Sequence, residues 1–367
     1  MFEYENRSIM KRLLADCIRA LSDTSYSVPG YPITELAEYS NSVFVINEKT
    51  AMEYALGDSL MRRRSVVIVK NVGVNALADP LVNATTQGLI GGVVLISGDD
   101  TAAENSQNRQ DTRPYAEVAS IPLVELDTED VHGSLEKAFE ESEMYSRVAL
   151  LRVTDVQLHM VIHDRYISVG SKDRGYGGLA GRGLTMKGRA EQADNLFKEK
   201  GNEPETVQMR GHSKTFCKNC PYKPLFEYIS KENIKVILDT GCAVLAMKDP
   251  YNIGLANYGL GSSIAVAARS VGIAITGDYA LLHSGMNALV DVYEKELPLL
   301  TVVLKNNRMG MTGGDISDVT QYLQWADPQV FNDMSILKEP VIKPKTFIFE
   351  TKCPGDERHE TIRYRDM

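Results

Sequence analysis

The hydrophobic positions in the first part of the chain follow helical spacing in some stretches and strand spacing in others. Apolar residues on one helical face predict a helix over Ile9–Leu21. Further helices are expected from Thr34, over Glu48–Arg62 and from about Pro80. Short uninterrupted apolar runs predict buried strands, at Phe44–Asn47, Ser65–Lys70, Gly92–Ser97, Leu123–Leu126 and Val148–Val153.

The same alternation returns in the last part of the chain. Strands are predicted at Val236–Asp239, Gly272–Thr276, Leu299–Lys305 and Thr346–Glu350, with helices at Ser262–Val271 and Asn287–Glu294. Between the two parts, Gly, Lys, Arg, Asn and Glu dominate, and one helix is expected near Arg189–Lys198. We therefore predict an α/β protein with two doubly wound parallel-sheet domains, residues 1–158 and 211–367, joined by a linker over 159–210.

The composition and charge of the chain argue against some classes of binding partner. The 367 residues carry a net charge of -9 without a basic stripe, so nucleic acid and anionic membranes are poor candidates. The N-terminus mixes acids and bases and lacks the apolar segment of a signal peptide. The longest uncharged apolar stretch, near 88–98, is too short to span a bilayer. The five cysteines, an odd number, argue against a disulfide framework, and we expect a cytoplasmic protein.

Two polar pairs follow neighbouring predicted strands. Gly277-Asp278 and Asn306-Asn307 each stand where an apolar strand ends, one helix-and-strand crossover apart. Ligand sites in open parallel sheets form at the carboxyl ends of strands. Carboxylate and amide oxygens suit Mg²⁺, and a Mg²⁺ so placed can bridge a diphosphate.

A glycine-rich turn, Asn257–Ser263, opens the helix just before these pairs. Its backbone could approach a phosphate at the helix N-terminus closely, or it could be an ordinary tight turn. Its position just before the Asp and Asn pairs favours the phosphate-binding interpretation.

This stretch resembles the GDG…NN signature of thiamine diphosphate (TPP) enzymes, with Tyr279 in place of the last glycine. The resemblance implies that Asp278 and Asn307 bind Mg²⁺ through their side chains, and Met309 through its carbonyl. It also implies contacts with the cofactor from the backbone and hydroxyl groups at Gly259, Gly261, Ser262 and Gly277. Tyr279 leaves the expected metal ligands intact but adds bulk beside the diphosphate.

Most of 25–155 and 210–355 is similar to the indolepyruvate:ferredoxin oxidoreductase family. The matching words are Gly30-Tyr31-Pro32, Asn47-Glu48-Lys49, Lys70-Asn71-Val72-Gly73, Asp79-Pro80-Leu81, Ser106-Gln107-Asn108, Gly241-Cys242, His283-Ser284-Gly285 and Met311-Thr312-Gly313-Gly314. The resemblance implies a pyrimidine-binding domain followed by a diphosphate-binding domain. The family's middle domains and C-terminal ferredoxin module have no counterpart here, so we expect a shortened form.

In TPP enzymes, a glutamate against the aminopyrimidine ring promotes loss of the C2 proton. Glu48 matches that position, although an acid in the first turn of a helix also suits the helix dipole. Candidates for binding a 2-oxoacid carboxylate are Thr34, Lys70 and Arg113, which could equally be a helix cap, a solvated lysine and a surface arginine. His283 could carry a proton or pack as an ordinary histidine.

Four cysteines form a second pattern. Cys217 and Cys220 form a CxxC, followed by Cys242 and Cys353, and four thiolates can hold a [4Fe–4S] cluster or Zn²⁺. These positions resemble the cluster ligands of the TPP-binding subunit in two-subunit 2-oxoacid:ferredoxin oxidoreductases. Single cysteines are also often small buried hydrophobes, as is expected for Cys17 on its apolar helix face.

Three functions remain open. The first is a subunit that decarboxylates a 2-oxoacid oxidatively and passes electrons to an iron–sulfur cluster or ferredoxin, with a second electron-transfer subunit. The second is a non-oxidative 2-oxoacid decarboxylase or carboligase, and the third a non-enzymatic subunit. The resemblance suggests an aryl 2-oxoacid as substrate, and a homodimer or larger assembly.

Overall fold

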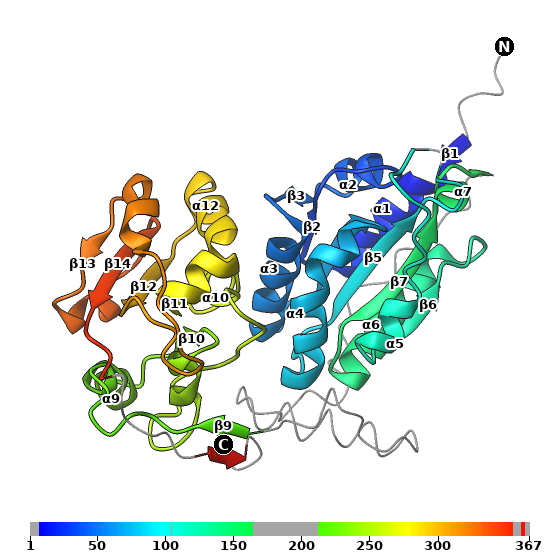
Figure 1. Ribbon diagram of the computed structural model, residues 1–367. Helices are drawn as coiled ribbons and strands as arrows, with labels where there is room; N and C mark the ends of the chain where they lie inside the picture. Colours follow the sequence, from blue (N-terminus) through cyan, green and yellow to red (C-terminus); the bar gives the residue numbers. More distant parts are fainter. Residues whose placement is uncertain (1–6, 104, 164–211, 355–360, 364–367) are drawn as a thin grey trace. The chain divides into compact units, whose positions relative to one another are not determined.

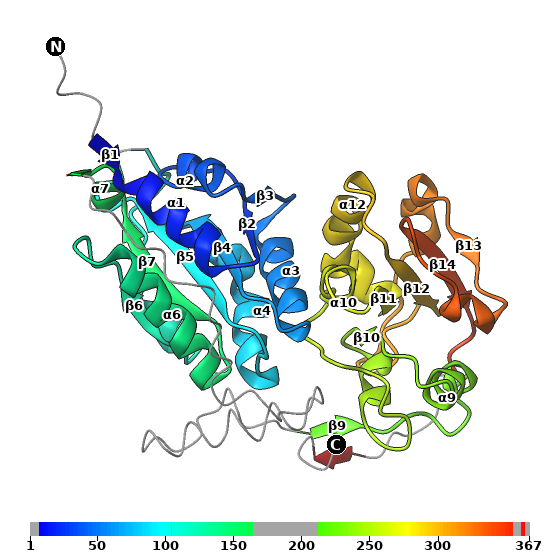
Figure 2. The same cartoon turned by 180° about the vertical axis from the view of Figure 1, so that it is seen from behind.

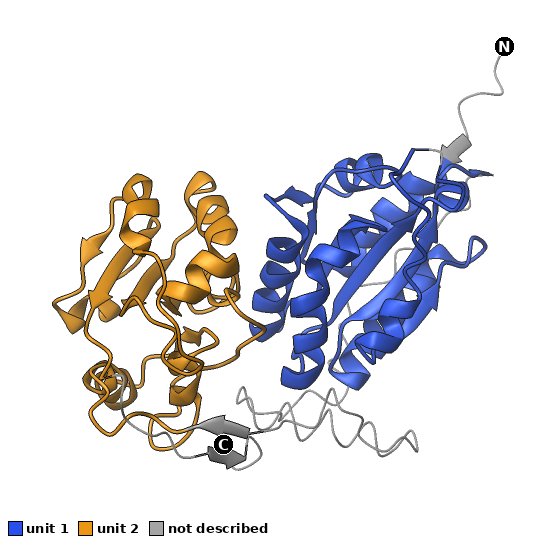
Figure 3. Ribbon diagram, viewed as in Figure 1, with its two compact units in different colours: residues 1–183, 189–203 blue, residues 184–188, 204–367 orange. Residues whose placement is uncertain are grey.

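The computed structural model describes residues 7–103, 105–163, 212–354 and 361–363. The described residues up to 163 belong to one compact unit and those from 212 onwards to a second (Figure 3). The expected helix near Arg189–Lys198 and most of the expected linker lie outside the described residues.

Unit 1 alternates strands and helices along the chain (Figure 1). Its strands are β1 (Arg7–Ile9), β2 (Thr24–Ser27), β3 (Val43–Phe44), β4 (Ser65–Lys70), β5 (Val93–Asp99), β6 (Leu123–Glu125), β7 (Ala149–Thr154) and β8 (Val161–His163). Its helices are α1 (Met10–Leu21), α2 (Thr34–Tyr39), α3 (Glu48–Leu60), α4 (Gly73–Gln87), α5 (Pro114–Val118), α6 (Val131–Tyr145) and α7 (Asp155–Leu158).

A six-stranded parallel sheet in the order β3-β2-β4-β5-β7-β6 forms the centre of unit 1. Alternate residues of β4 and β5, such as Val66, Ile68 and Ile96, join a core with α1 and α6. Helices α3 and α4 pack against one another and against β4, so helices cover both faces (Figure 2). Burial on both faces explains why these strands are continuous apolar runs.

Strand β2 and helix α4 of unit 1 differ from the sequence-based expectations. Strand β2, Thr-Ser-Tyr-Ser, was not predicted because its residues are polar; its Ser27 hydroxyl donates to the carbonyl of Ile68 at 2.8 Å, which satisfies a polar group inside the sheet. The helix expected from Pro80 begins earlier, at Gly73, and contains Pro80 in its interior. The helix start was wrong because proline favours, but does not require, the first turn.

A buried ion pair joins the start of β4 to α6. The Arg64 guanidinium donates to both carboxylate oxygens of Glu143, at 2.6 and 2.8 Å, and lies over the Phe139 ring at 4.9 Å from its centroid. Both charged side chains are less than a tenth exposed. Removing one partner would therefore leave the other charge buried without compensation.

We expect Glu143→Ala to lower the free energy of unfolding by about 3–5 kcal/mol in urea unfolding. Glu141→Ala, on the same helix, removes only the exposed pair with Lys137, whose atoms are 3.9 Å apart, and should cost less than about 1 kcal/mol. Equal effects of the two substitutions would contradict a stabilising role for the buried pair.

Unit 2 has the same class of architecture. Its strands are β9 (His212–Lys214), β10 (Ile237–Leu238), β11 (Ile273–Gly277), β12 (Leu300–Lys305), β13 (Gln329–Val330), β14 (Lys345–Glu350) and β15 (Thr361–Arg363). Its helices are α9 (Lys223–Lys231), η1 (Cys242–Met247), α10 (Ser263–Ala268), α11 (Asp278–Ala280), η2 (Leu281–Gly285), α12 (Met286–Glu294), η3 (Val319–Tyr322), η4 (Gln324–Ala326) and η5 (Met334–Lys338).

A five-stranded parallel sheet in the order β10-β11-β12-β14-β13 forms the centre of unit 2. Strand β11 pairs with β12 so that Gly277 stands opposite Leu304, and β12 pairs with β14 so that Lys305 stands opposite Glu350. The carboxyl ends of neighbouring strands therefore meet at one edge of the sheet. The expected fold of two parallel-sheet α/β domains is confirmed. None of the helices in the described part of the chain has an apolar run long enough to cross a bilayer.

Candidate cofactor-binding site

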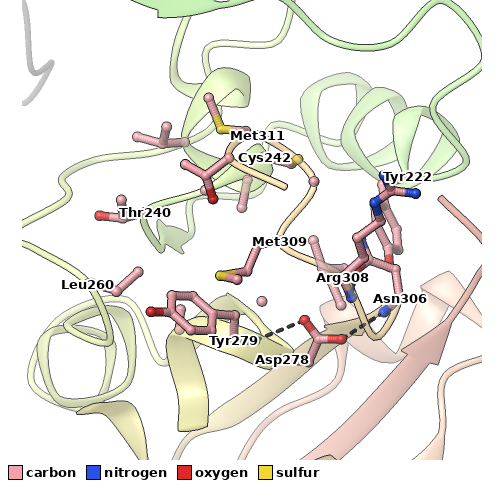
Figure 4. Close-up of a pocket in the computed structure, with 18 residues that line it drawn as sticks. Tyr222, Thr240, Cys242, Leu260, Asp278, Tyr279, Asn306, Arg308, Met309 and Met311 are labelled. Atoms are coloured by element: carbon pink, nitrogen blue, oxygen red, sulfur yellow. Dashed lines mark hydrogen bonds between the residues drawn. The ribbon is translucent and has the colours of Figure 1, made fainter. Parts of the chain in front are cut away.

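Asp278 connects the ends of two neighbouring strands. It follows β11 and is only 2% exposed. One of its carboxylate oxygens accepts from the backbone N–H groups of Asn306 (2.9 Å) and Asn307 (2.7 Å), which follow β12. The other oxygen accepts from the backbone N–H of Tyr279 at 2.8 Å (Figure 4). The structure thus brings together the two polar pairs that the sequence predicted.

Asn307 holds an unusual backbone conformation. Its φ of 54° lies in the left-handed region, which asparagine tolerates better than most residues. Its side-chain oxygen is buried and accepts no hydrogen bond from any described residue. A buried oxygen without a partner is costly, and a divalent cation would satisfy it. The pair of Asp278 and Asn307 therefore fits Mg²⁺.

The carbonyl of Met309 was the third expected metal ligand. It accepts from the N–H of Gly313 at 2.7 Å, while the N–H of Met309 donates to the carbonyl of Gly314 at 2.9 Å. A carbonyl has two lone pairs, so one remains for a metal ion. Within the described ranges, no three His, Cys, Asp or Glu side chains are arranged to hold a metal, and Mg²⁺ commonly takes fewer protein carboxylates than that.

A cavity of about 480 Å³ lies beside these residues. Its wall includes Asp278, Asn306, Met309, Tyr279 and Leu260 (Figure 4). Such a volume lies within the range of small-molecule sites. At Gly277, a side-chain carbon would meet no atom within 4 Å, so the backbone there is open to a ligand.

Asp239, the residue after β10, holds the glycine-rich turn in place through hydrogen bonds. The Asp239 carboxylate is fully buried and accepts from the N–H of Gly261 (2.7 Å) and the hydroxyls of Ser263 (2.7 Å) and Thr276 (3.0 Å). Thr276 belongs to β11, two residues before Asp278. One carboxylate thus fixes the turn and the strand that leads to Asp278.

Several hydrogen-bond donors of the turn are already engaged within unit 2. The N–H of Gly261 points to Asp239, and the Ser262 hydroxyl donates to the carbonyl of Gly259 at 2.8 Å. Gly261 has a φ of 84°, and a side chain there would lie 2.5 Å from the backbone nitrogen of Gly285. That Gly259, Gly261 and Ser262 contact a diphosphate stays a prediction. Sequence reasoning missed Asp239, although an acid ending an apolar strand was a signal.

Burial raises the pKa of Asp239, and its hydroxyl and N–H donors oppose that shift. Burial likewise raises the pKa of Asp278, against the backbone N–H groups of Asn306, Asn307 and Tyr279. Neither carboxylate has a basic partner among the described residues. The apo site therefore holds two buried acids without a compensating cation.

His283 lies outside the wall of the cavity. Its side chain is exposed; its Nδ1 lies 3.1 Å from the Ser284 hydroxyl, and its ring centroid lies 5.7 Å from that of Tyr279. It belongs to η2, a π-helical turn, a feature frequent at functional sites. Its role as a proton carrier stays a prediction.

The four cysteines of unit 2 gather beside the loop that follows β12. A side-chain carbon at Gly310 would lie 3.3 Å from the sulfur of Cys242 and 3.8 Å from that of Cys353. Burial raises the pKa of Cys242 to about 12, and the nearby thiols of Cys220, Cys217 and Cys353 add to the rise. None of the four forms a disulfide with a described residue, and within the described ranges no three of them are arranged to hold one metal ion. Cys17 lies in the core of unit 1, as expected.

In unit 1, Glu48 is the first residue of α3. Asn47 caps this helix by accepting from the N–H of Thr50 at 2.8 Å. Lys49 binds Glu53 (3.0 Å) and Asp79 (2.7 Å), so it does not neutralise its neighbour. The half-buried Glu48 carboxylate makes no hydrogen bond or ion pair with any described residue. It is therefore available to a ligand.

The three expected substrate-binding side chains each have a local partner. Thr34 accepts from the N–H of Gly30 at 2.9 Å and donates to its carbonyl at 3.0 Å. Lys70 donates to Gln107 at 3.0 Å, and its chain packs against Gly30, which brings it beside the Thr34 turn. The half-exposed Arg113 binds Asp111. That these residues bind a substrate stays a prediction.

Asp239 makes the stability of unit 2 depend on pH. Its folded-state pKa lies above the unfolded value of about 3.9, so its stabilising contribution is complete at low pH and is lost as pH rises through the folded pKa. Asn at this position keeps an acceptor for Gly261 and a donor for the hydroxyls. We expect Asp239→Asn to gain stability relative to the native chain as pH rises from 4 to 8, measured by urea unfolding.

Asp239→Ala, which leaves the same donors without a partner, should be destabilised by about 1–3 kcal/mol or more throughout this pH range. Parallel pH profiles for the native chain and Asp239→Asn would contradict the expected titration.

Comparison with known proteins agrees with this geometry. Residues 239–338 match the family described as thiamine pyrophosphate enzyme, C-terminal TPP binding domain. Indolepyruvate oxidoreductase subunit IorA of Methanothermobacter thermautotrophicus is 34% identical over 156 residues, which cover 40% of this chain and 25% of that protein. The IorA of Pyrococcus abyssi is 34% identical over 142 residues, covering 36% and 22%. The chain thus matches about a quarter of the length of these curated relatives.

One solved structure covers nearly the whole fold. An X-ray structure of a Mycobacterium smegmatis protein assigned to the thiamin diphosphate-dependent enzymes aligns with a TM-score of 0.63 and 11% identity. It covers 94% of this chain and 99% of that chain, and at this identity the likeness concerns the fold alone. Residues 239–338 are therefore similar to the C-terminal TPP-binding domain of thiamine pyrophosphate enzymes, and part of the chain resembles indolepyruvate oxidoreductase subunit IorA.

Proposed function

We propose that this protein binds TPP with Mg²⁺ and decarboxylates a 2-oxoacid oxidatively, passing the electrons to an iron–sulfur cluster or ferredoxin. The observation that carries the proposal is the Asp278 and Asn307 pair. Asp278 lines the cavity, and the amide oxygen of Asn307, which stands between the lining residues Asn306 and Arg308, is buried and has no hydrogen-bond partner among the described residues. Both residues lie in the segment that matches the TPP-binding domain. The names of the IorA relatives support a 2-oxoacid with an aryl side chain.

TPP, when bound, supplies the nucleophile and the electron sink for decarboxylation. Asp278 and Asn307 would hold Mg²⁺ against its diphosphate, and the open backbone at Gly277 would let the phosphate approach. Glu48 would hold a proton at the aminopyrimidine side. Two features support that role: its carboxylate has no partner within the described ranges, and its neighbour Lys49 is committed to Glu53 and Asp79.

The cysteine gathering favours the oxidative reaction over a non-oxidative decarboxylase or carboligase. Four thiols share one region beside the cavity, and Cys242 also lines it. Removing electrons one at a time requires an acceptor near the cofactor, and four thiolates could hold a [4Fe–4S] cluster there. The raised pKa of Cys242 means that metal binding must displace protons.

The complete assembly belongs to the proposal as well. We propose a homodimer or larger, working with a second electron-transfer subunit or ferredoxin. Light scattering tests the first part, since a monomer with full TPP affinity would contradict it.

The decisive experiment is anaerobic turnover of a panel of 2-oxoacids with TPP, Mg²⁺ and an artificial electron acceptor. Acceptor-dependent CO₂ release, highest with aryl 2-oxoacids, is the expected result. CO₂ release without need of an acceptor, from a colourless protein, would favour the non-oxidative decarboxylase. No thiamine-dependent release from any member of the panel would exclude both.

Asn307→Ala should weaken Mg²⁺-dependent TPP binding by about 10–100-fold in titration calorimetry, because it removes an oxygen ligand of the metal. Asn233→Ala is the matched control, since Asn233 also has a left-handed φ, 52°, in the same unit but follows α9 and not β12. Equal affinities for the two variants would argue against a metal ligand at Asn307.

Cys353→Ser should abolish the visible absorption of the protein reconstituted with iron and sulfide under anaerobic conditions. Cys17→Ala, in the core of unit 1, should leave that absorption unchanged. The same spectrum from both variants would contradict a four-cysteine cluster.

A further inference from the structure

The Glu48 carboxylate occupies space that exists only because residue 73 is glycine. A side-chain carbon at Gly73 would lie 2.7 Å from Oε1 of Glu48, 3.0 Å from its Cγ and 3.2 Å from its Cδ. Contacts under 3.0 Å between a carbon and such an atom are repulsive, so any larger residue at 73 would displace the carboxylate. Gly73 is the first residue of α4, and its φ does not fall in the left-handed region, so its backbone does not require glycine.

The backbone on both sides of this contact is held in place. Asn47 caps α3 directly before Glu48, and Lys49 crosses from α3 to Asp79 of α4 with a 2.7 Å ion pair while also binding Glu53. Helices α3 and α4 pack against each other along their length. A methyl group at position 73 would therefore be accommodated by the flexible Glu48 side chain rather than by a shift of either helix.

No hydrogen bond or ion pair in the described part of the chain holds the Glu48 carboxylate in its orientation. It lies in the space that a side chain at position 73 would fill. We propose that Gly73 is a positioning residue for Glu48, because its lack of a side chain leaves open the space that the proposed proton-transfer carboxylate occupies. This inference rests on the proposed function of Glu48, while the contact itself can be tested without cofactor.

The position of this carboxylate matters because proton transfer needs a separation of about 2.6–3.2 Å between the two heavy atoms. A displacement of about 1 Å can cost on the order of 100-fold in rate. A residue larger than glycine at 73 should thus impair proton transfer while leaving the diphosphate and metal contacts in unit 2 unchanged.

The first test measures thermal stability of the unliganded protein. Gly73→Ala is made in the native chain and in the Glu48→Ala variant, where the space is empty. Alanine favours a helix over glycine, so the substitution should raise Tm by up to about 2–4 °C in the Glu48→Ala background. With Glu48 present, the increase should be smaller or reversed. The same shift in both backgrounds would overturn the contact.

The second test measures exchange of the C2 proton of bound TPP with solvent, by acid quench and NMR. Gly73→Ala should slow this exchange by at least about tenfold, with TPP affinity in calorimetry within about twofold of the native value. In the Glu48→Ala background it should cause no further slowing, because residues that act through one group are not additive. Unchanged exchange in Gly73→Ala would overturn the inference.

These outcomes separate the inference from the proposed function. If Glu48→Ala does not slow exchange, the proposed role of Glu48 fails, whatever the stability cycle shows. If Glu48→Ala slows exchange and Gly73→Ala does not, the proposed function stands and the positioning role of Gly73 is overturned.

Discussion

The Asp278 carboxylate, bonded to the backbone N–H groups of Asn306 and Asn307, is the interaction on which the candidate site depends. It joins the residues that follow two adjacent parallel strands, and both of its oxygens are engaged by backbone groups. Because backbone donors cannot turn away as side chains do, the carboxylate is fixed in direction. The left-handed Asn307 stands at the same edge of the sheet, and its buried amide oxygen accepts no hydrogen bond from any described residue.

Unit 2 buries two acidic side chains, Asp239 and Asp278, near the candidate site. Asp239 and Asp278 both have raised pKa values, and each is stabilised by neutral donors instead of a basic side chain of the described residues. Neutral donors reduce the cost of burying a charge but do not cancel it. A bound Mg²⁺ and a cationic cofactor ring would supply the missing compensation. The cost of burying these two carboxylates would thus favour binding of a cation beside them.

Unit 1 contributes a different kind of group. Glu48 is the first residue of a capped helix, makes no hydrogen bond or ion pair with any described residue, and lies in the space that a side chain at Gly73 would fill. This differs from Asp278, both of whose carboxylate oxygens accept hydrogen bonds from backbone N–H groups. Lys49, the residue after Glu48, forms ion pairs with Glu53 and Asp79, so it does not neutralise the Glu48 carboxylate.

The sequence by itself determined the class of fold and the central pair of the site. Long apolar runs such as Ser65–Lys70 must be buried on both faces, and parallel strands bring their carboxyl ends to one edge, so Asp278 and Asn307 had to meet. Strand β2 was not predicted because its residues are polar. In the structure its Ser27 hydroxyl is hydrogen-bonded to the neighbouring strand β4, which satisfies that polar group. Helices α6 and α9 were also not predicted, although Asp130 is a clear cap for α6.

Only the tertiary structure decided which side chains are free to bind. Thr34, Lys70 and Arg113 looked equally available in the sequence, but each has a partner from a turn or loop. Three features of the structure join residues more than 20 positions apart in the sequence. Asp239 accepts from Gly261, Glu48 lies in the space beside Gly73, and Cys242 and Cys353 both lie near Gly310. The spacing of apolar residues along a chain predicts helices and strands, because each has its own period. The partner of a buried polar group cannot be predicted in this way, because it depends on how the elements pack together.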